Sequence, residues 1–291
     1  MTLRRQYVEI STVTPMRNER LCAREFVRRV DVALRSLTDD YEIIVVDDGS
    51  TDTTPEQVKT IAKKDPRVTF FDNPNKVPRT NWRGYDINAG YAARNYGFSI
   101  AKGRWITTQD ADDASLLNRI EAQRDLAEKY QATLVTIQFQ RLRPELLDKK
   151  LDVERIFKEK GEDATVIHPE TILTRAYRNR GLLMREPFHK WIPFPIKWFP
   201  YTRKLFYPRV DIYPGADNCM LFDRKVLDDG VYFRTRNERT WGTPNGRGSG
   251  RDFVFRVAEK YKNSWSFKLP LYLWNANTEN PDYIGYDKYL I

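Results

Sequence analysis

Three carboxylates crowd into four positions of the segment TTQDADDAS, at residues 107–115, which follows an apolar run that favours a β-strand. They belong to Asp110, Asp112 and Asp113. Like charges this close repel one another, so either the segment is a solvated turn or a cation lies among the carboxylates and offsets their repulsion. Only the second interpretation gives these residues a chemical role.

A second acidic pair, Asp47 and Asp48, ends the apolar run in VVDDGSTD at residues 45–52. In open α/β sheets, ligands bind beyond the carboxyl ends of the strands. One interpretation of this pair is an Asx turn. The other is a carboxylate that accepts hydrogen bonds from the N3–H and ribose hydroxyls of a uridine, with Gly49 allowing the sharp turn. Two acidic strand ends in one domain fit a shared site better than two unrelated turns.

The elements that must position these acids alternate between strand and helix over the first 140 residues. This alternation predicts the α/β class, with a doubly wound, mainly parallel sheet flanked by helices. No glycine-rich loop follows the first strand, which argues against a dinucleotide-binding or P-loop domain. The expected strands cover 7–13, 42–46, 68–71, 105–109 and 132–139, and the expected helices include 91–101, 115–130 and 252–261.

Residues 141–210 carry a weaker pattern and are expected to be an insertion between two parts of one domain, 1–140 and 211–291. The formal net charge is +9, from 49 Lys and Arg against 40 Asp and Glu, which favours anionic partners. Most of the excess lies in residues 175–209, called the arm below. There, nine basic residues and one acid, Glu186, alternate with aromatic residues and prolines. The two cysteines, Cys22 and Cys219, are expected to be buried thiols in a reducing cytoplasm.

Four pieces of the sequence resemble, in their order, glycosyltransferase family 2, whose members have the GT-A fold. The pieces are ISTVTPMRNE, IIVVDDGSTDTT, NAGYAARNYGFSIAKGRWITTQDADD and GRDFVFRVAEKY. The resemblance implies an inverting transfer of a sugar from a nucleoside diphosphate sugar. By the same resemblance Thr14 and Pro15 border the base, Asp48 contacts uracil, and Asn88 and Arg94 lie near the nucleotide or its phosphates.

Asp110 and Asp112 correspond to the DxD motif of that family. A divalent metal held between such acids and a diphosphate stabilises the charge that develops on the leaving group. Asp112 is expected to bind the metal directly, while Asp110 reaches the ribose or a water of the metal. Asp113 is expected to hold the donor sugar or to support the other two. Hard oxygen ligands favour Mn²⁺ or Mg²⁺ over zinc.

Direct displacement at the anomeric carbon also needs a base that deprotonates the acceptor hydroxyl. Family 2 members use the aspartate of an ED motif that opens a late helix, and GRDFVFRVAEKY makes Asp252 the candidate. Arg251 stands where a glutamate is usual. The alternative is that Asp252 is a helix N-cap or a first-turn acid.

The arm admits three interpretations: an irregular segment packed on the acceptor side, a contact with an anionic membrane surface, or a site for an acidic glycan acceptor. A nucleic-acid partner is not expected, because no recognised binding module frames the arm. The expected activity is the metal-dependent transfer of a sugar from a nucleoside diphosphate sugar to a glycan or lipid-linked acceptor. The expected donor is a UDP-sugar. The expected location is the cytoplasm or the inner face of the membrane. The alternative is a catalytically silent GT-A domain that serves as a binding or scaffold subunit. A nucleotidyltransferase is not favoured, because the sequence lacks the glycine- and lysine-rich loop that this class carries near its first strand.

Overall fold

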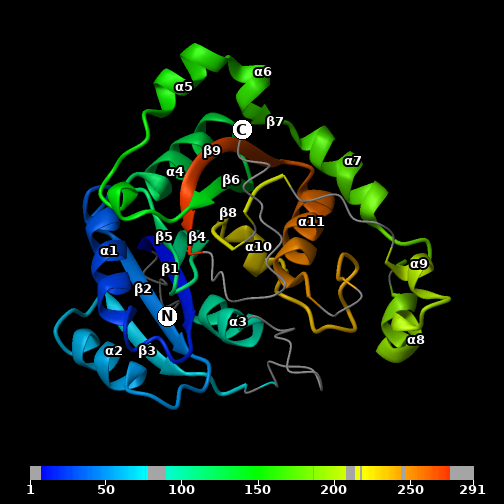
Figure 1. Ribbon diagram of the computed structural model, residues 1–291, viewed down its shortest axis with the longest axis horizontal. Coiled ribbons are helices and arrows are strands. Elements are labelled where there is room, and N and C mark those ends of the chain that lie inside the picture. The colour runs from blue at the N-terminus through cyan, green and yellow to red at the C-terminus, as the bar shows by residue number, and fades with distance from the viewer. Residues whose placement is uncertain are drawn as a thin grey trace, which may run out of the picture.

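One central β-sheet with helices on both faces organises the protein (Figure 1). The computed structural model describes residues 8–75, 77, 90–185, 187–207, 214–216, 218–243 and 247–275. Within these residues the strand order is β3-β2-β1-β4-β8-β6-β9-β5, and β7 pairs with β9. The strands are β1 (Val8–Met16), β2 (Tyr41–Asp47), β3 (Val68–Asp72), β4 (Gly103–Thr108), β5 (Ala114–Ser115), β6 (Leu134–Arg141), β7 (Val166–Ile167), β8 (Leu221–Asp223) and β9 (Ser264–Trp274).

The longest ladders of this sheet are parallel. Strands β3, β2, β1 and β4 run in one direction, and β6 pairs in parallel with β9. Short β8 lies between these groups and runs antiparallel to both β4 and β6. The carboxyl ends of β1, β2 and β4 therefore meet at one edge, which holds the acidic segments noted in the sequence. The expected mainly parallel sheet flanked by helices is confirmed.

The helices pack on the two faces of the sheet and also build residues 142–207. They are α1 (Ala23–Arg35), α2 (Thr54–Ala62), α3 (Tyr91–Ile100), α4 (Arg119–Lys129), α5 (Val153–Lys160), α6 (Glu162–Thr165), α7 (Pro169–Asn179), α8 (Phe194–Trp198), α9 (Arg203–Phe206), α10 (Lys225–Asp228) and α11 (Ser249–Tyr261), with two 3₁₀ turns, η1 (Pro144–Leu146) and η2 (Phe188–Trp191).

Two hydrophobic cores lie on opposite faces of the sheet because successive side chains of a strand point to opposite sides. In β2, Ile43 and Val45 face the core that α1, α2 and α4 cover. Ile44 and Val46 face the other core, which α3, α7, α10 and α11 cover. This arrangement explains why β2 is an uninterrupted apolar run in the sequence.

Helix α3 lies very close to the sheet. A Cβ added to Gly97 would lie 2.4 Å from Cγ1 of Val13 and 3.3 Å from Cγ2 of Val46, so only glycine allows this approach. The close packing fixes the position of Arg94, one turn earlier on the same helix.

The expected helix at 115–130 begins four residues late in the structure. Ala114 and Ser115 form β5, which pairs with β9, and α4 begins at Arg119 with Asn118 as its N-cap. The Ser115 hydroxyl donates to Oε1 of Gln109, 2.8 Å away, instead of capping a helix. A strand from the far end of the chain therefore overrides the local helix pattern.

The insertion runs along the outside of the molecule from α5 to α9, with α8 and α9 at the edge opposite α1 and α2 (Figure 1). It is more regular than its sequence suggests, because α7 packs against α11 and β7 extends the sheet through β9. The predicted boundaries at 140 and 210 remain an interpretation. In the described ranges, no helix combines the length and apolar composition that crossing a bilayer requires.

Candidate active site

The two adjacent aspartates at the end of β2 have different roles. Asp47 is buried, and its Oδ2 accepts from the backbone N–H groups of Gly49 and Ser50, at 3.0 and 2.9 Å. Asp47 therefore forms the Asx turn that the sequence offered as one interpretation. Asp48 is half-buried, and its Oδ1 accepts from Nδ2 of Asn73, 3.1 Å away. Its carboxylate is thus held in place at the edge where β1, β2 and β4 end.

Pro15 and Gly90 lie beside Asp48, and Thr14 precedes Pro15 in β1, where it pairs with Val45. A Cβ added to Gly90 would lie 3.1 Å from Cβ of Pro15 and 3.7 Å from Oδ2 of Asp48. Thr14 is fully buried, and its hydroxyl has no hydrogen-bond partner among the described residues. The predicted neighbours of the base, Thr14, Pro15 and Asp48, therefore gather at one edge of the sheet. Asn88 lies outside the described residues.

The Asp110 side chain is fixed from two directions just beyond β4. Its Oδ1 is ion-paired with Nη2 of Arg94, which α3 supplies, and its Oδ2 accepts from Nδ2 of Asn218, 3.0 Å away. The same Nδ2 also donates to the hydroxyl oxygen of Tyr272, 2.9 Å away. The guanidinium carbon of Arg94 lies 5.9 Å from the ring centre of Phe233. Arg94 thus contacts the acidic turn through Asp110, and its predicted position near the nucleotide or its phosphates stays a prediction.

Asp113 is the buried member of that turn. Its carboxylate accepts from the hydroxyl of Tyr272 and, at 2.7 Å, from the backbone N–H of Asn275. Burial, together with the negative charges of Asp110 and Asp112, raises the pKa of Asp113 to about 8. Each of these causes disfavours the ionised carboxylate. A cation beside the turn would reverse the electrostatic part of this effect.

Asp112 is the exposed member of the acidic turn, whereas Asp110 is half-buried and Asp113 is buried. No group of three or more His, Cys, Asp or Glu side chains in the described ranges is placed to hold a metal. Among the described residues, protein carboxylates alone therefore do not supply a complete set of metal ligands. Mg²⁺ sites commonly combine one or two carboxylates with phosphate oxygens of a substrate, and this donor set fits that pattern.

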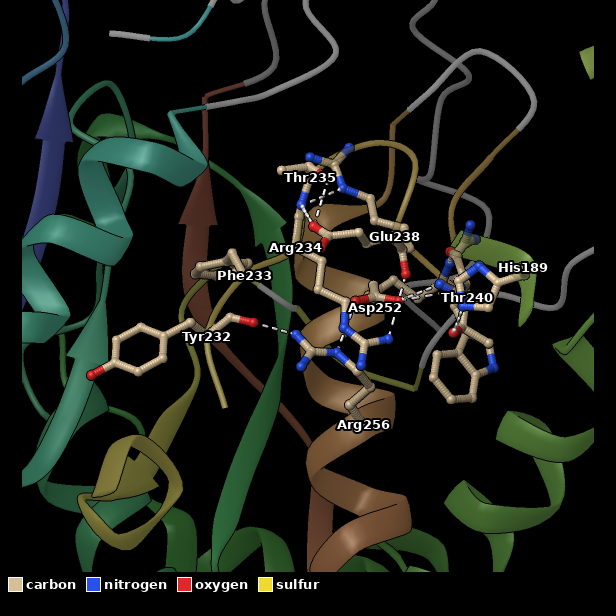
Figure 2. A network of polar contacts seen from close by, with 12 residues as sticks. His189, Tyr232, Phe233, Arg234, Thr235, Glu238, Thr240, Asp252 and Arg256 are labelled. Atoms are coloured by element: carbon tan, nitrogen blue, oxygen red, sulfur yellow. Dashed lines mark hydrogen bonds and ion pairs between the residues drawn. The ribbon is translucent and has the colours of Figure 1, made fainter. Parts of the chain in front are cut away.

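Asp252 lies in the first turn of α11 and is fully buried (Figure 2). Its Oδ1 accepts from the backbone N–H groups of Thr240 and Trp241, at 2.7 and 3.3 Å. Its Oδ2 forms an ion pair with Nε of Arg256, 2.9 Å away. The N-cap of α11 is Gly248, so Asp252 does not cap its own helix. Its carboxylate instead holds a neighbouring loop.

That loop, residues 232–243, connects Asp252 to helix α3. Asn95 of α3 exchanges two hydrogen bonds of 2.9 Å with the backbone of Phe233. The guanidinium carbon of buried Arg239 lies 5.2 Å from the ring centre of Tyr91, in the first turn of α3. Asp252 and the Arg94–Asp110 pair thus belong to one connected group of elements.

Several residues that hold the site have no local sequence signal. Asn218 precedes β8 and Tyr272 lies in β9, so both approach the acidic turn through long-range strand pairing. Asn73 follows β3 at the same sheet edge, and its position after a strand could have identified it. The two histidines of the chain have packing roles, because His189 is buried near Thr240 and His168 packs against Trp265.

Solved structures with this fold are known. The crystal structure of residues 1–349 of S. aureus TarS in complex with UDP matches with a TM-score of 0.53 and 13% sequence identity. The match covers 92% of this chain and 60% of that one. At this identity the similarity establishes the fold alone, and it confirms the expected GT-A architecture.

Curated relatives match the chain over shorter stretches. The glycosyltransferase GlyG of Streptococcus pneumoniae is 35% identical over 112 residues, which are 38% of this chain and 33% of GlyG. An undecaprenyl-phosphate 4-deoxy-4-formamido-L-arabinose transferase of Pseudomonas fluorescens is 35% identical over 103 residues, 35% of this chain and 27% of that protein. The chain spans only 17% of another relative, an uncharacterized glycosyltransferase of Rickettsia conorii. The family model Glycosyl transferase family 2 matches residues 11–230, and the chain belongs to this family.

Proposed function

We propose that this chain is a metal-dependent, inverting glycosyltransferase. Its donor is a nucleoside diphosphate sugar in which the nucleoside diphosphate is UDP. It transfers the sugar to a glycan or lipid-linked acceptor. The observation that carries the proposal is the placement of two acidic segments at one sheet edge: Asp48 at the end of β2 and the 110–113 turn just beyond β4. One segment suits a nucleoside and the other suits a metal diphosphate.

In this proposal, Asp112 and Asp110 hold Mn²⁺ or Mg²⁺ together with oxygens of the diphosphate. The metal supplies positive charge for the leaving nucleoside diphosphate. Arg94 and Asn218 keep Asp110 oriented, and Asp113 supports the turn from behind through Tyr272. The crowding of three carboxylates in four positions supports a cation at this position, because a cation offsets their mutual repulsion.

The donor and acceptor classes have separate support. TarS, which shares the fold, was crystallised in complex with UDP, and this supports a uridine donor. In this proposal, Thr14, Pro15 and Asp48 surround the base and Asn88 lies near the nucleotide. The Pseudomonas relative is named for transfer involving undecaprenyl phosphate, which supports a lipid-linked acceptor. Neither observation identifies the sugar.

Asp252 is the proposed base. It would accept the proton of the acceptor hydroxyl as that oxygen attacks the anomeric carbon and the nucleoside diphosphate leaves. Both of its oxygens already accept hydrogen bonds, and those from Thr240 and Trp241 come from a loop. Displacement of this loop by an acceptor would expose Oδ1, whereas the Arg256 pair within α11 can remain.

The test is a screen of nucleoside diphosphate sugars for release of the nucleoside diphosphate, with Mn²⁺, with Mg²⁺ and with a chelator. We expect release from a UDP-sugar that depends on added metal and rises with a suitable acceptor. Tight, metal-dependent binding of donors with no release under any condition would support the silent GT-A domain instead. Release that is equally fast with the chelator would contradict the metal assignment.

Asp48→Ala is expected to weaken UDP binding by about 1–3 kcal/mol, the cost of leaving a buried donor without its acceptor. Isothermal titration calorimetry with UDP measures the change. Asp72→Ala is a matched control, because Asp72 ends the adjacent strand β3 with a side chain that is 69% exposed. Equal UDP affinity of the Asp48 variant and the wild type would show that the base binds elsewhere.

A further inference from the structure

Exposed apolar side chains of the described residues concentrate in one segment. Nine of the twelve exposed large hydrophobic residues lie between residues 177 and 205, and the other three are Leu21, Val32 and Val77. Scattered exposed apolar residues are normal, but a concentration of this kind marks an interaction surface. The nine are Tyr177, Leu182, Phe188, Trp191, Ile196, Trp198, Phe199, Tyr201 and Leu205.

This surface is built on a folded support. Behind it, Met184, Phe206 and Tyr207 are buried in a small separate core. The exposed fraction of Trp191 is nevertheless 81%, and that of Tyr201 is 86%. The segment thus buries one set of apolar side chains and presents another set to solvent.

Hydrogen bonds fix this segment to the 232–243 loop. Buried Lys197 donates from Nζ to the carbonyl oxygen of Asn237, 2.6 Å away, and Nδ2 of Asn237 donates to the carbonyl oxygen of Lys190, at 2.8 Å. The guanidinium carbon of Arg236 lies 3.9 Å from the ring centre of Phe194. Because Lys197 is enclosed, its pKa falls to about 8. Its amino group is therefore directed at the 232–243 loop, whereas other basic side chains of the segment face the solvent.

The other basic side chains make this surface positively charged. Arg178, Arg185, Arg203 and Lys204 are exposed, and Glu186 is the one acid in the arm. Interfacial segments of proteins combine such cations with aromatic and aliphatic side chains that enter the headgroup layer. Exposed aliphatic residues such as Ile196 and Leu205 favour a lipid surface over a glycan.

We propose that the outer surface of residues 177–205 docks on a bilayer that contains anionic lipids. The 232–243 loop, which holds these residues, also carries the N–H groups bound by Asp252. Docking would therefore place the acceptor side of the site at the headgroup layer, where a lipid-linked acceptor presents its sugar. This last step rests on the proposed function, whereas the docking itself does not.

The experiment is sedimentation of the full chain with vesicles of phosphatidylcholine alone or mixed with phosphatidylglycerol, without donor. We expect binding to the mixed vesicles only. Arg203→Gln with Lys204→Gln should lower the partition coefficient by roughly 30-fold, from the usual contribution of two cations near an anionic surface. Trp191→Ser, Ile196→Ser and Tyr201→Ser together should lower it by about tenfold or more.

Leu21→Ser with Val32→Ser is the matched control, because it removes exposed apolar side chains near α1, away from the arm. This variant should bind vesicles like the wild type, and all variants should keep their circular dichroism and UDP affinity. Equal binding to neutral and mixed vesicles, or unchanged binding by both arm variants, would overturn the proposal. So would a wild-type dimer that does not bind vesicles and that the serine variant converts to monomer, because a second copy would then cover the surface. Vesicle binding without any sugar transfer would count against the proposed function alone.

Discussion

Asp112→Asn is expected to lower sugar transfer by about 10³-fold or more and to remove the dependence of donor binding on metal. The side chain is exposed, so the substitution removes a negative charge without disturbing the packing of the core. The melting temperature without ligands should stay at the wild-type value. Transfer assays with Mn²⁺ titration, together with calorimetry of donor binding, measure both effects.

Asp148→Asn is the matched control for Asp112→Asn, because the Asp148 side chain is 84% exposed and lies outside the site. It should leave transfer and metal dependence unchanged. An Asp112→Asn enzyme with turnover close to the wild-type rate would remove Asp112 from the metal site. The alternative interpretation, in which residues 110–113 form a solvated turn without a metal, would then be favoured.

Asp252→Asn is expected to lower the transfer rate by about 10²-fold to 10⁴-fold, the usual contribution of a positioned base, while UDP and metal affinity stay unchanged. The burial of Asp252 adds a second effect. Removing one partner of a buried ion pair costs on the order of 3 kcal/mol, so the variant should also unfold at lower denaturant concentration. Single-turnover kinetics and urea unfolding measure the two effects separately.

Arg256→Met separates a base from a purely positioning residue. It breaks the pair with Asp252 and the contact with the Tyr232 carbonyl, but it keeps the carboxylate. If Asp252 is the base, this variant loses stability and retains most of the transfer rate. If both variants lose rate equally and share one pH dependence, Asp252 acts by holding the 232–243 loop. Near-normal turnover of Asp252→Asn would exclude either role.

The sequence predicts the first half of the fold well because its strands are buried and its helices have one apolar face. β2 is an example, since an apolar run with acidic residues at its end already indicates a central parallel strand. The error at Ser115 has a physical reason. Its partner, Tyr272 of β9, lies far along the chain, and local periodicity carries no information about such pairing.

Without the family resemblance, residues of the candidate site could be predicted only where they follow a strand. Asp48 and Asp110 could be identified because each stands at or just beyond a strand's carboxyl end. Asn218 and Tyr272 reach the site through tertiary structure, and so does the enclosure of Asp252 by Thr240 and Trp241. The composition of the arm already indicated an apolar surface, but only the structure identifies which of its residues face outward.

The reversed direction of β8 has a consequence for how members of this fold can diversify. Because β8 runs antiparallel to β4 and β6, Leu221 pairs with Val135 near the start of β6, whereas the chain leaves β6 at its other end, Arg141. Residues 142–220 therefore form a long excursion that adds β7 to the sheet and ends close to Asn218, which orients Asp110. The entropic cost of closing such an excursion grows only slowly with its length. The part of this stretch between β7 and Asn218 can therefore change in length to suit a different recipient, provided that Asn218 keeps its contact with Asp110.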